Sequence, residues 1–194
     1  MALVAYSKSL RKAAISFPKC SFMRKRRLPV EAIKAELTQE RFVRYTSKLN
    51  NEIYIVNVHN SPETVQEVGR LRELTFASAD GGTGKPVDLD ELDLSDNPYQ
   101  QLIVWNPEEE EIVGGYRFID GATVAGGKGN PQHDLSMGHY FQFSKHFLED
   151  YLPYSIELGR SWVQPKYQPA VDPRKGMFAL DNIWDGLGAI VLKY

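Results

Sequence analysis

"QLIVWNPEEEEIVGGYRFI" (residues 101–119) contains two apolar runs that are separated by a short turn rich in glutamate. Runs of β-branched and aromatic residues bounded by turn residues predict strands, here over residues 101–105 and 111–119. A connection this short joins two strands as an antiparallel hairpin. The stretch therefore predicts an antiparallel hairpin as part of a sheet.

The segments before the hairpin predict a further strand and a helix. Residues 52–59, "EIYIVNVH", alternate apolar and polar side chains, as a half-buried strand does. The next stretch, "SPETVQEVGRLRELTFASA" (61–79), opens with a good N-cap, Ser61, and a proline that suits the first helical turn. We expect a helix there. A weaker helical pattern covers residues 31–46, and residues 80–99 form a long loop rich in glycine and acid.

The segments after the hairpin predict a loop, a short helix, a strand and a last helix. Residues 121–132 are rich in glycine and predict a flexible loop, and residues 140–152 predict a helix that stops before Pro153. Residues 155–165 predict a strand, and residues 176–194 a helix. The last helix is expected to place these apolar residues on one face: Leu180, Ile183, Trp184, Leu187, Ile190 and Val191.

This order of elements indicates the α/β class. In such folds a parallel strand usually follows a helix of this kind. The chain stops directly after the last predicted helix. We therefore expect C-terminal strands either to be missing from this chain or to come from elsewhere.

Charge is unevenly distributed along the chain. Residues 1–30 hold eight of the 23 Lys and Arg residues and none of the 25 acids, so the remaining 164 residues carry 15 cations against 25 acids. We expect residues 1–30 to be a disordered basic arm that favours an anionic partner, and residues 31–194 to be the folded domain. The first twenty-odd residues also resemble a transit peptide. The alternative is that Met23 is the true start and that everything before it is an upstream extension.

Several classes of function are excluded or disfavoured. Cys20 is the single cysteine, so an internal disulfide or a cysteine-based zinc site is excluded and a reducing, cytoplasmic compartment is favoured. No apolar run is long enough for a transmembrane helix. No cluster of His, Cys or acids has metal-ligand spacing, and the acidic body disfavours nucleic-acid binding.

One short segment carries the candidate chemistry. In "SIELGRSWVQP" (155–165), Glu157 and Arg160 are three residues apart, so a regular strand would point them to opposite faces. Gly159 lies between them, and a glycine inside a strand often marks a β-bulge. A bulge would bring the two side chains together and leave a backbone N–H free to hold an oxyanion. The alternative is a salt bridge at the sheet margin that carries no chemistry.

Five short motifs, in order, resemble the GNAT-fold N-acyltransferases: "RELTF" (72–76), "DELD" (90–93), "VGGYR" (113–117), "GHYFQF" (138–143) and "ELGRSWV" (157–163). The closest branch contains ornithine-lipid-type N-acyltransferases and bacterial proteins labelled "hemolysin". Acyl-homoserine-lactone synthases are more distant. The resemblance implies a GNAT-like mixed, mostly antiparallel sheet flanked by helices, truncated here after the helix that follows the central strand. It also implies a V-shaped gap beside that strand for the pantetheine arm of an acyl thioester.

The resemblance assigns site residues at matching positions only. It implies substrate-binding roles for Arg72, Phe76, Asp90, Asp93 and Arg117. It places the Glu and Arg of the central strand at Glu157 and Arg160. Arg174, Lys175 and Gly176 precede the last helix, whose N-terminus can receive a phosphate.

The Gly-rich phosphate loop of acetyl-CoA-binding members is incomplete in this sequence. That departure favours acyl carrier protein as the donor beside acyl-CoA, and no permanently bound cofactor is expected. Carrier proteins are acidic, so the basic arm would recruit them or dock on a membrane, peripherally on the inner membrane.

The resemblance and the residues together predict an amide-forming enzyme. A fatty-acyl group would pass from an acyl thioester to the amine of an amino acid or related amine, in amino-acid-lipid biosynthesis. Glu157 would be the base and a backbone N–H near Trp162 or Val163 the oxyanion donor. His133 and His139 are rival bases. The alternatives are a non-catalytic module that binds membranes or carrier proteins, and a synthase of an acylated signal molecule.

Overall fold

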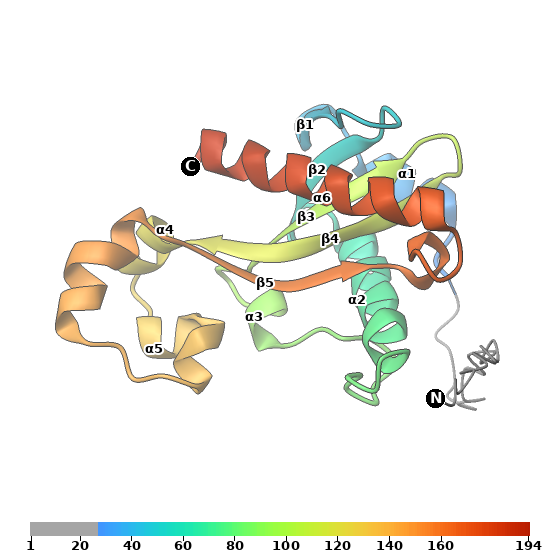
Figure 1. Ribbon diagram of the computed structural model, residues 1–194. Helices are drawn as coiled ribbons and strands as arrows, with labels where there is room; N and C mark the ends of the chain where they lie inside the picture. Colours follow the sequence, from blue (N-terminus) through green and yellow to red (C-terminus); the bar gives the residue numbers. More distant parts are fainter. Residues whose placement is uncertain (1–26) are drawn as a thin grey trace, which may run out of the picture.

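The structure, a computed structural model, describes residues 27–194 as an antiparallel sheet with helices on both faces (Figure 1). The predicted basic arm, residues 1–30, falls almost entirely outside the described residues. The five strands are β1 (Phe42–Tyr45), β2 (Glu52–Val56), β3 (Gln100–Asn106), β4 (Glu111–Asp120) and β5 (Ile156–Val163). The α-helices are α1 (Val30–Glu36), α2 (Pro62–Ala77), α3 (Glu91–Leu94), α4 (Gly121–Gly126), α5 (Pro131–Asp134) and α6 (Pro173–Lys193).

The sheet has the order β1-β2-β3-β4-β5, and each neighbouring pair is antiparallel. β3 and β4 form the predicted hairpin. The predicted class, a sheet of this kind flanked by helices, is confirmed. Within residues 27–194, β5 lies at one edge of the sheet and no strand pair is parallel.

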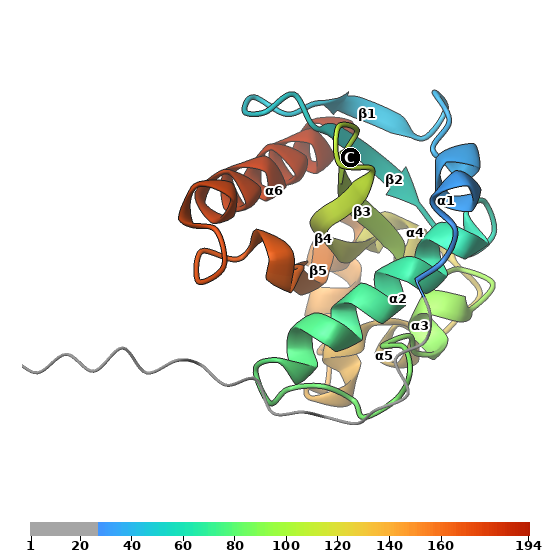
Figure 2. The ribbon, with the colours of Figure 1, turned by 90° about the vertical axis from the view of Figure 1, so that its right-hand side faces the viewer.

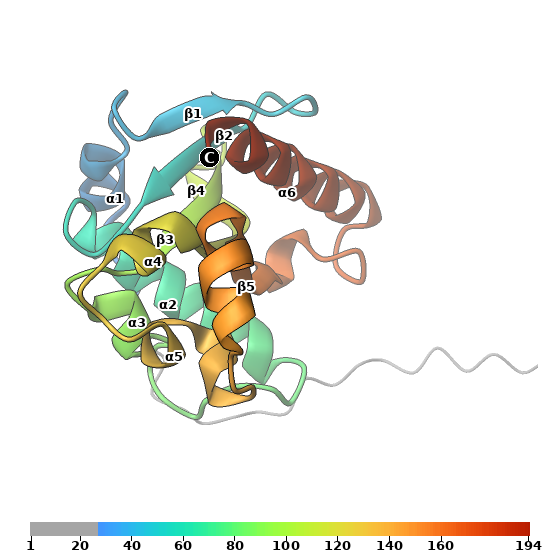
Figure 3. The same cartoon turned by 90° about the vertical axis from the view of Figure 1, so that its left-hand side faces the viewer.

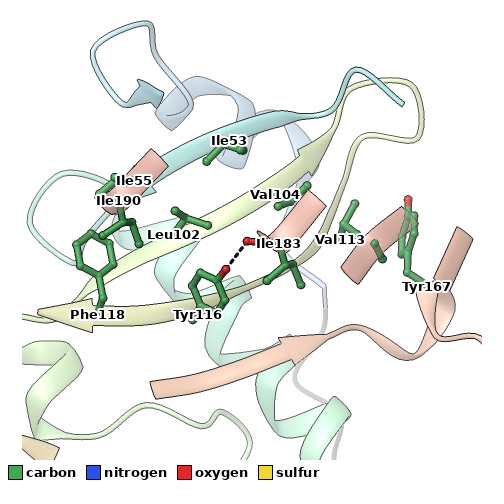
Figure 4. Packing of buried hydrophobic residues seen from close by; sticks show 11 residues of the cluster. Ile53, Ile55, Leu102, Val104, Val113, Tyr116, Phe118, Tyr167, Ile183 and Ile190 are labelled. Atoms are coloured by element: carbon green, nitrogen blue, oxygen red, sulfur yellow. Dashed lines mark hydrogen bonds between the residues drawn. The ribbon is translucent and has the colours of Figure 1, made fainter. Parts of the chain in front are cut away.

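Helices α2 and α6 cover opposite faces of the sheet (Figure 2). On the α6 side, Leu102, Phe118 and Ile190 are fully buried in one apolar cluster, which Figure 4 shows from close by. In that cluster the hydroxyl of Tyr116 donates to the backbone carbonyl of Ile183, which ties β4 to α6. On the other face, Val65, Val68 and Leu71 of α2 pack against the sheet in a second apolar cluster. Each face of the sheet therefore has its own apolar core.

The predicted helix at residues 61–79 is confirmed as α2, but its cap is different. Ser61 makes no capping hydrogen bond. The carboxylate of Glu36, at the end of α1, instead accepts from the backbone N–H of Glu63 and of Thr64, at 3.1 and 2.7 Å. A negative charge at this end also complements the helix dipole. The cap thus comes from a residue that is distant in sequence and brought close by the fold.

The last helix buries only part of its predicted apolar face. Ile183 and Ile190 are buried, whereas Leu180, Trp184 and Val191 are exposed by 53, 69 and 68%. These residues share one stripe of α6, as their spacing predicts, but only part of that stripe faces the sheet. The sheet covers one side of α6, while the other apolar residues line its outer side.

Three other predictions need correction. Residues 31–46 do not form one helical segment, because β1 follows α1 and pairs with β2. The predicted loop over residues 80–99 contains α3, and the predicted loop over residues 121–132 contains α4 and the start of α5.

The predicted helix over residues 140–152 is instead a π-helical turn, Phe147–Tyr151, that runs into a 3-10 turn, Leu152–Tyr154, through Pro153. Side-chain caps stabilise the short helices of this region. Asp120 and Asn130 accept from backbone N–H groups at the start of α4 and α5. The segment from α4 to the 3-10 turn lies beside one end of the sheet (Figure 3). Among residues 27–194, no helix is both long and apolar enough to cross a bilayer.

Candidate active site

The β4–β5 ladder contains the predicted bulge. Gly159 lies opposite Arg117 and Trp162 lies opposite Gly115, so two residues of β5 face one residue of β4. The predicted position at Gly159 is wrong by one residue, since Arg160 and Ser161 are the two residues that oppose Tyr116 alone. The backbone of Arg160 has a φ of 50°, in the left-handed region that favours glycine. The distortion is therefore centred on the arginine.

The bulge brings Glu157 and Arg160 to the same side of the sheet. Residues directly opposite each other in a ladder share a face, and Glu157 pairs with Ile119 while Gly159 pairs with Arg117. The guanidinium of Arg160 reaches Asp90, which also contacts Arg117. Both predicted side chains thus lie on the α2 side of β5.

Three arginines and three aspartates form a network on this side, here called the Arg–Asp cluster. Its members are Arg72, Asp88, Asp90, Asp93, Arg117 and Arg160. Arg72 is fully buried and lies 3.1 Å from Asp88 and 3.3 Å from Asp93. Arg117 lies 2.8 Å from Asp90 and 3.2 Å from Asp93. Equal numbers of opposite charges balance, as buried ions require.

The two aspartates of "DELD" also build α3. Asp90 is the N-cap and accepts from the backbone N–H of Leu92 and Asp93, while the Asp93 carboxylate accepts from the backbone N–H of Asp90. This reciprocal arrangement is a capping box. Burial would raise the pKa of Asp90, but the charge and hydrogen bonds of Arg117 outweigh it and lower the pKa. Asp90 is therefore held as an anion.

Glu157 lies beside the cluster in a different environment. Burial raises its pKa, and this effect outweighs the opposing hydrogen bonds from the Tyr99 hydroxyl and the Met137 backbone and the nearby charge of Arg117. A carboxylate with a raised pKa is a stronger base than an exposed one. Glu157 is only partly buried, so it is not sealed inside the core.

Tyr99 and the segment at residues 136–137 complete the surroundings of Glu157. The Tyr99 hydroxyl accepts from the backbone N–H of Ser136 at 2.9 Å, and the guanidinium of Arg117 lies 4.8 Å from the centre of the Tyr99 ring. Sequence reasoning missed these residues. A single tyrosine after a proline carries no pattern, and only the preceding "DELD" motif pointed to this loop.

An apolar cleft of about 290 Å³ lies beside the second half of β5, at residues 161–163. It is lined by Thr75, Ser161, Trp162, Val163, Gln168, Pro169, Gly176 and Leu180. These residues come from the end of α2, from β5, and from the first turns of α6 with the loop before it. The cleft therefore runs beside the strand that carries Glu157.

The remaining predicted site residues fall in different places. Val163 and Gly176 line the cleft. Phe76 packs against the core under α2 and is not among the lining residues. Asp172 accepts from the backbone N–H of Arg174 and of Lys175, so the first turn of α6 already carries a carboxylate.

The two cations of the predicted phosphate site and the two histidines considered as rival bases lie in different surroundings. The Lys175 ammonium donates to Glu109, while the Arg174 side chain is exposed. His133 and His139 are both exposed and lie outside the Arg–Asp cluster. No group of His, Cys, Asp and Glu within residues 27–194 could hold a metal ion.

A five-stranded antiparallel sheet with helices on both faces, bulged beside a cleft, defines the class of this domain. The chain belongs to the acetyltransferase (GNAT) domain family, whose model matches residues 71–172. That match covers the C-terminal part of α2, the Arg–Asp cluster, the hairpin and β5.

Two curated relatives are similar over most of the chain. A glycine N(alpha)-acyltransferase of Phocaeicola vulgatus is 52% identical over 163 residues, which is 84% of this chain and 49% of the relative. A glycine N(alpha)-acyltransferase of Bacteroides thetaiotaomicron is 51% identical over 162 residues, 84% of this chain and 48% of the relative. The chain thus spans about half the length of the relatives it matches. No solved structure matches the chain.

Proposed function

We propose that this domain transfers an acyl group from an acyl thioester to the α-amine of glycine or another small amino acid. The names of the two relatives support an amide-forming acyl transfer to glycine. The observation that carries the proposal is Glu157, a partly buried carboxylate with a raised pKa on the strand that walls the cleft. A base is needed there because an ammonium must lose a proton before it can attack a carbonyl carbon.

The reaction balances with groups that the chain supplies. Glu157 takes one proton from the ammonium, directly or through one water, and later releases it to solvent. The amine nitrogen forms a bond to the thioester carbonyl carbon, and the carbon–sulfur bond breaks as the tetrahedral intermediate collapses. The second amine proton goes to the departing thiolate. The products are an N-acyl amino acid and a free thiol.

The bulge would stabilise the intermediate. The extra residue of a bulge has no ladder partner, so backbone N–H groups near it are available to a ligand. We assign the oxyanion to a backbone N–H near Trp162 or Val163, both of which line the cleft. Preorganised donors of this kind typically contribute 10²–10³-fold in rate.

The donor is proposed to be acyl carrier protein or acyl-CoA. The cleft would take the pantetheine arm, which both donors share. The carboxylate of Asp172 occupies the first N–H groups of α6, so a phosphate there would meet a negative charge. This favours the carrier protein, which presents fewer phosphates than CoA. Parallel assays with acyl-CoA and with acyl carrier protein of the same acyl length distinguish the two.

The wider setting is a proposal from sequence alone. A fatty-acylated amino acid is itself a lipid, which fits the ornithine-lipid-like and "hemolysin"-like branch and a role in amino-acid-lipid biosynthesis. The eight cations of residues 1–30 support contact with an acidic carrier protein or with the inner membrane from the cytoplasm.

The direct test is amide formation. The chain is incubated with acyl carrier protein or CoA thioesters and a panel of amino acids, and products are detected by mass spectrometry. An N-acylglycine that forms with the wild type and is lost in Glu157→Gln supports the proposal. A product that forms equally in Glu157→Gln removes the assigned base, and a lactone product favours a signal synthase.

One observation favours the non-catalytic alternative. The outer side of α6 exposes Met177, Trp184 and Val191, an apolar stripe at helical spacing. Vesicle binding without any acyl product would favour a binding module over an enzyme.

A further inference from the structure

Gly159 leaves a small hollow on the α2 side of β5, in that only two of the surrounding atoms would lie within 4 Å of a Cβ at this position. The nearest atoms to a Cβ at this position would be Nε and Cγ of Arg117, at 3.7 and 3.8 Å, which is ordinary van der Waals contact. At Gly114 and Gly115, by contrast, a Cβ would lie 2.4 and 2.1 Å from a backbone oxygen. Gly159 is also not among the residues with positive φ. Neither packing nor backbone conformation therefore requires glycine at 159.

Two buried polar atoms near this hollow lack a partner among the described residues. They are Nε of Arg117, a donor, and Oε1 of Gln101, an acceptor. The two residues are direct neighbours in the β3–β4 ladder, and their side chains are 2 and 1% exposed. The other groups of these side chains are used, since Gln101 donates to Asp93 and Arg117 donates to Asp90 and Asp93. Buried polar atoms are rarely left unpaired, so a donor and an acceptor side by side point to a ligand.

Opposite charges flank the hollow along β5. Glu157 lies two residues before Gly159 on the same face, and Arg160 follows it directly. The Arg160 side chain is 35% exposed, so its guanidinium is within reach of a small solute, unlike the buried arginines of the cluster. A carboxylate on one side and a guanidinium on the other match a zwitterion, whose ammonium would face Glu157 and whose carboxylate would face Arg160.

We propose that this hollow, formed by Gln101, Arg117, Glu157, Gly159 and Arg160, is the acceptor subsite, a proposal that rests on the proposed function. It selects α-amino acids with a free carboxylate and little or no side chain. Arg160 binds the carboxylate of the amino acid, and the absence of a side chain at Gly159 leaves space for the bound amino acid. The bulge serves this subsite because it turns Arg160 to the same side as Glu157.

The test compares Gly159→Ala with Gly126→Ala, a matched control at which a Cβ would meet no atom within 4 Å. Gly159→Ala is expected to keep the wild-type melting temperature and the KM for the acyl donor, and to raise the KM for glycine at least tenfold. Gly126→Ala is expected to match the wild type. An unchanged KM for glycine in Gly159→Ala overturns the subsite while the proposed function stands.

The carboxylate is tested with glycine against glycinamide, which has the same amine and no carboxylate. The wild type is expected to prefer glycine, and Arg160→Gln to reduce that preference in kcat/KM at least tenfold, with partial recovery in Arg160→Lys. Equal use of both amines by the wild type overturns the subsite and leaves acyl transfer intact.

Binding of isotope-labelled glycine, followed by NMR without a donor, gives a readout that does not need chemistry. Binding to the wild type and not to Gly159→Ala supports the subsite even where no amide forms, which would contradict only the acyl transfer. No binding and no amide with any acceptor overturns both.

Discussion

Arg117 donates from a single nitrogen, Nη1, to both carboxylate oxygens of Asp90 at 2.8 Å, and so ties β4 to the first turn of α3. The same nitrogen lies 3.2 Å from Asp93, which Arg72 also contacts. One loop is thereby fixed to the sheet and to α2 at once. The Arg–Asp cluster therefore joins β4, α2 and the α3 loop beside Glu157.

Asp93→Asn should be strongly destabilising. Asp93 is fully buried between Arg72 and Arg117, so its loss leaves two buried guanidinium groups with too little negative charge. We expect a loss of about 3–5 kcal/mol in the free energy of unfolding, measured by urea denaturation. Asp96→Asn, an exposed acid of the same loop, is the control and should lie within about 0.5 kcal/mol of the wild type. Equal effects of the two would show that the cluster does not stabilise the fold.

Glu157→Gln should separate activity from stability. The pKa of Glu157 is higher in the folded than in the unfolded protein. The protonated carboxyl group therefore stabilises the fold below the unfolded pKa, and this stabilisation is lost as the pH rises through the folded pKa. At neutral pH the ionised carboxylate opposes folding. The variant should unfold at an equal or higher urea concentration at pH 7, while its kcat falls by about 10²–10⁴. The acid limb of the wild-type kcat/KM profile should lie above pH 4.5, the ordinary value for glutamate. A limb at or below that value would argue against Glu157 as the base.

Gly115→Ala should disrupt the hairpin. A Cβ at this position would lie 2.1 Å from the backbone oxygen of Leu102, which cannot move aside as a flexible side chain could. We expect a loss of about 1–3 kcal/mol or more, seen as a lower melting temperature. Gly188→Ala, on α6 with no atom within 4 Å, should be neutral or stabilising by up to about 1 kcal/mol. A wild-type melting temperature for Gly115→Ala would contradict the β3–β4 register.

Ser161→Leu should obstruct the cleft without unfolding the protein. The Ser161 side chain is exposed at the bulge and lines the cleft, so a larger apolar residue would occupy the path of the acyl donor. The KM for the acyl donor should rise about tenfold, with the melting temperature unchanged. Ser95→Leu adds the same side chain to the exposed C-cap of α3 and should leave KM as in the wild type. An unaffected donor KM in Ser161→Leu would place the donor elsewhere.

Glu109→Gln should make stability depend less on pH. Hydrogen bonds from Lys166 and Lys175 lower the pKa of Glu109 to about 2 from an ordinary 4.5. Such a carboxylate stabilises the fold above pH 4.5, and its contribution is lost as the pH falls from about 4.5 to about 2. At pH 7 the variant should lose about 1 kcal/mol or less, because the pairs are partly exposed, and the difference should shrink between pH 4.5 and 3. Glu108→Gln, its exposed neighbour, should show no such trend.

Local patterns predicted the elements that depend on local signals. The hairpin, β2, α2 and β5 all follow from apolar periodicity and turn residues. The same reasoning placed Glu157 and Arg160 together through a bulge, but it put the bulge at Gly159. The register of β5 depends on β4, which lies far away in sequence, so the strand alone could not show which residue is extra.

Other features depend on contacts that no local pattern carries. The Glu36 cap of α2 is one, because Glu36 ends α1, and β1 and β2 separate α1 from α2 in the sequence. The influence of Tyr99 on the pKa of Glu157 is another, since Tyr99 directly precedes β3 whereas Glu157 lies on the edge strand β5. The outer face of α6 is a third: periodicity shows that Trp184 is apolar and on a stripe, but it cannot show which stripe the sheet covers.

The left-handed backbone of Arg160 places local strain and ion pairing in opposition at one position. Glycine at 160 would relieve a conformational cost of about 1–2 kcal/mol but would also remove the guanidinium that contacts Asp88 and Asp90. A gain in melting temperature at this codon would therefore not by itself report an intact site. A screen of this domain needs catalytic turnover as a second criterion in every round.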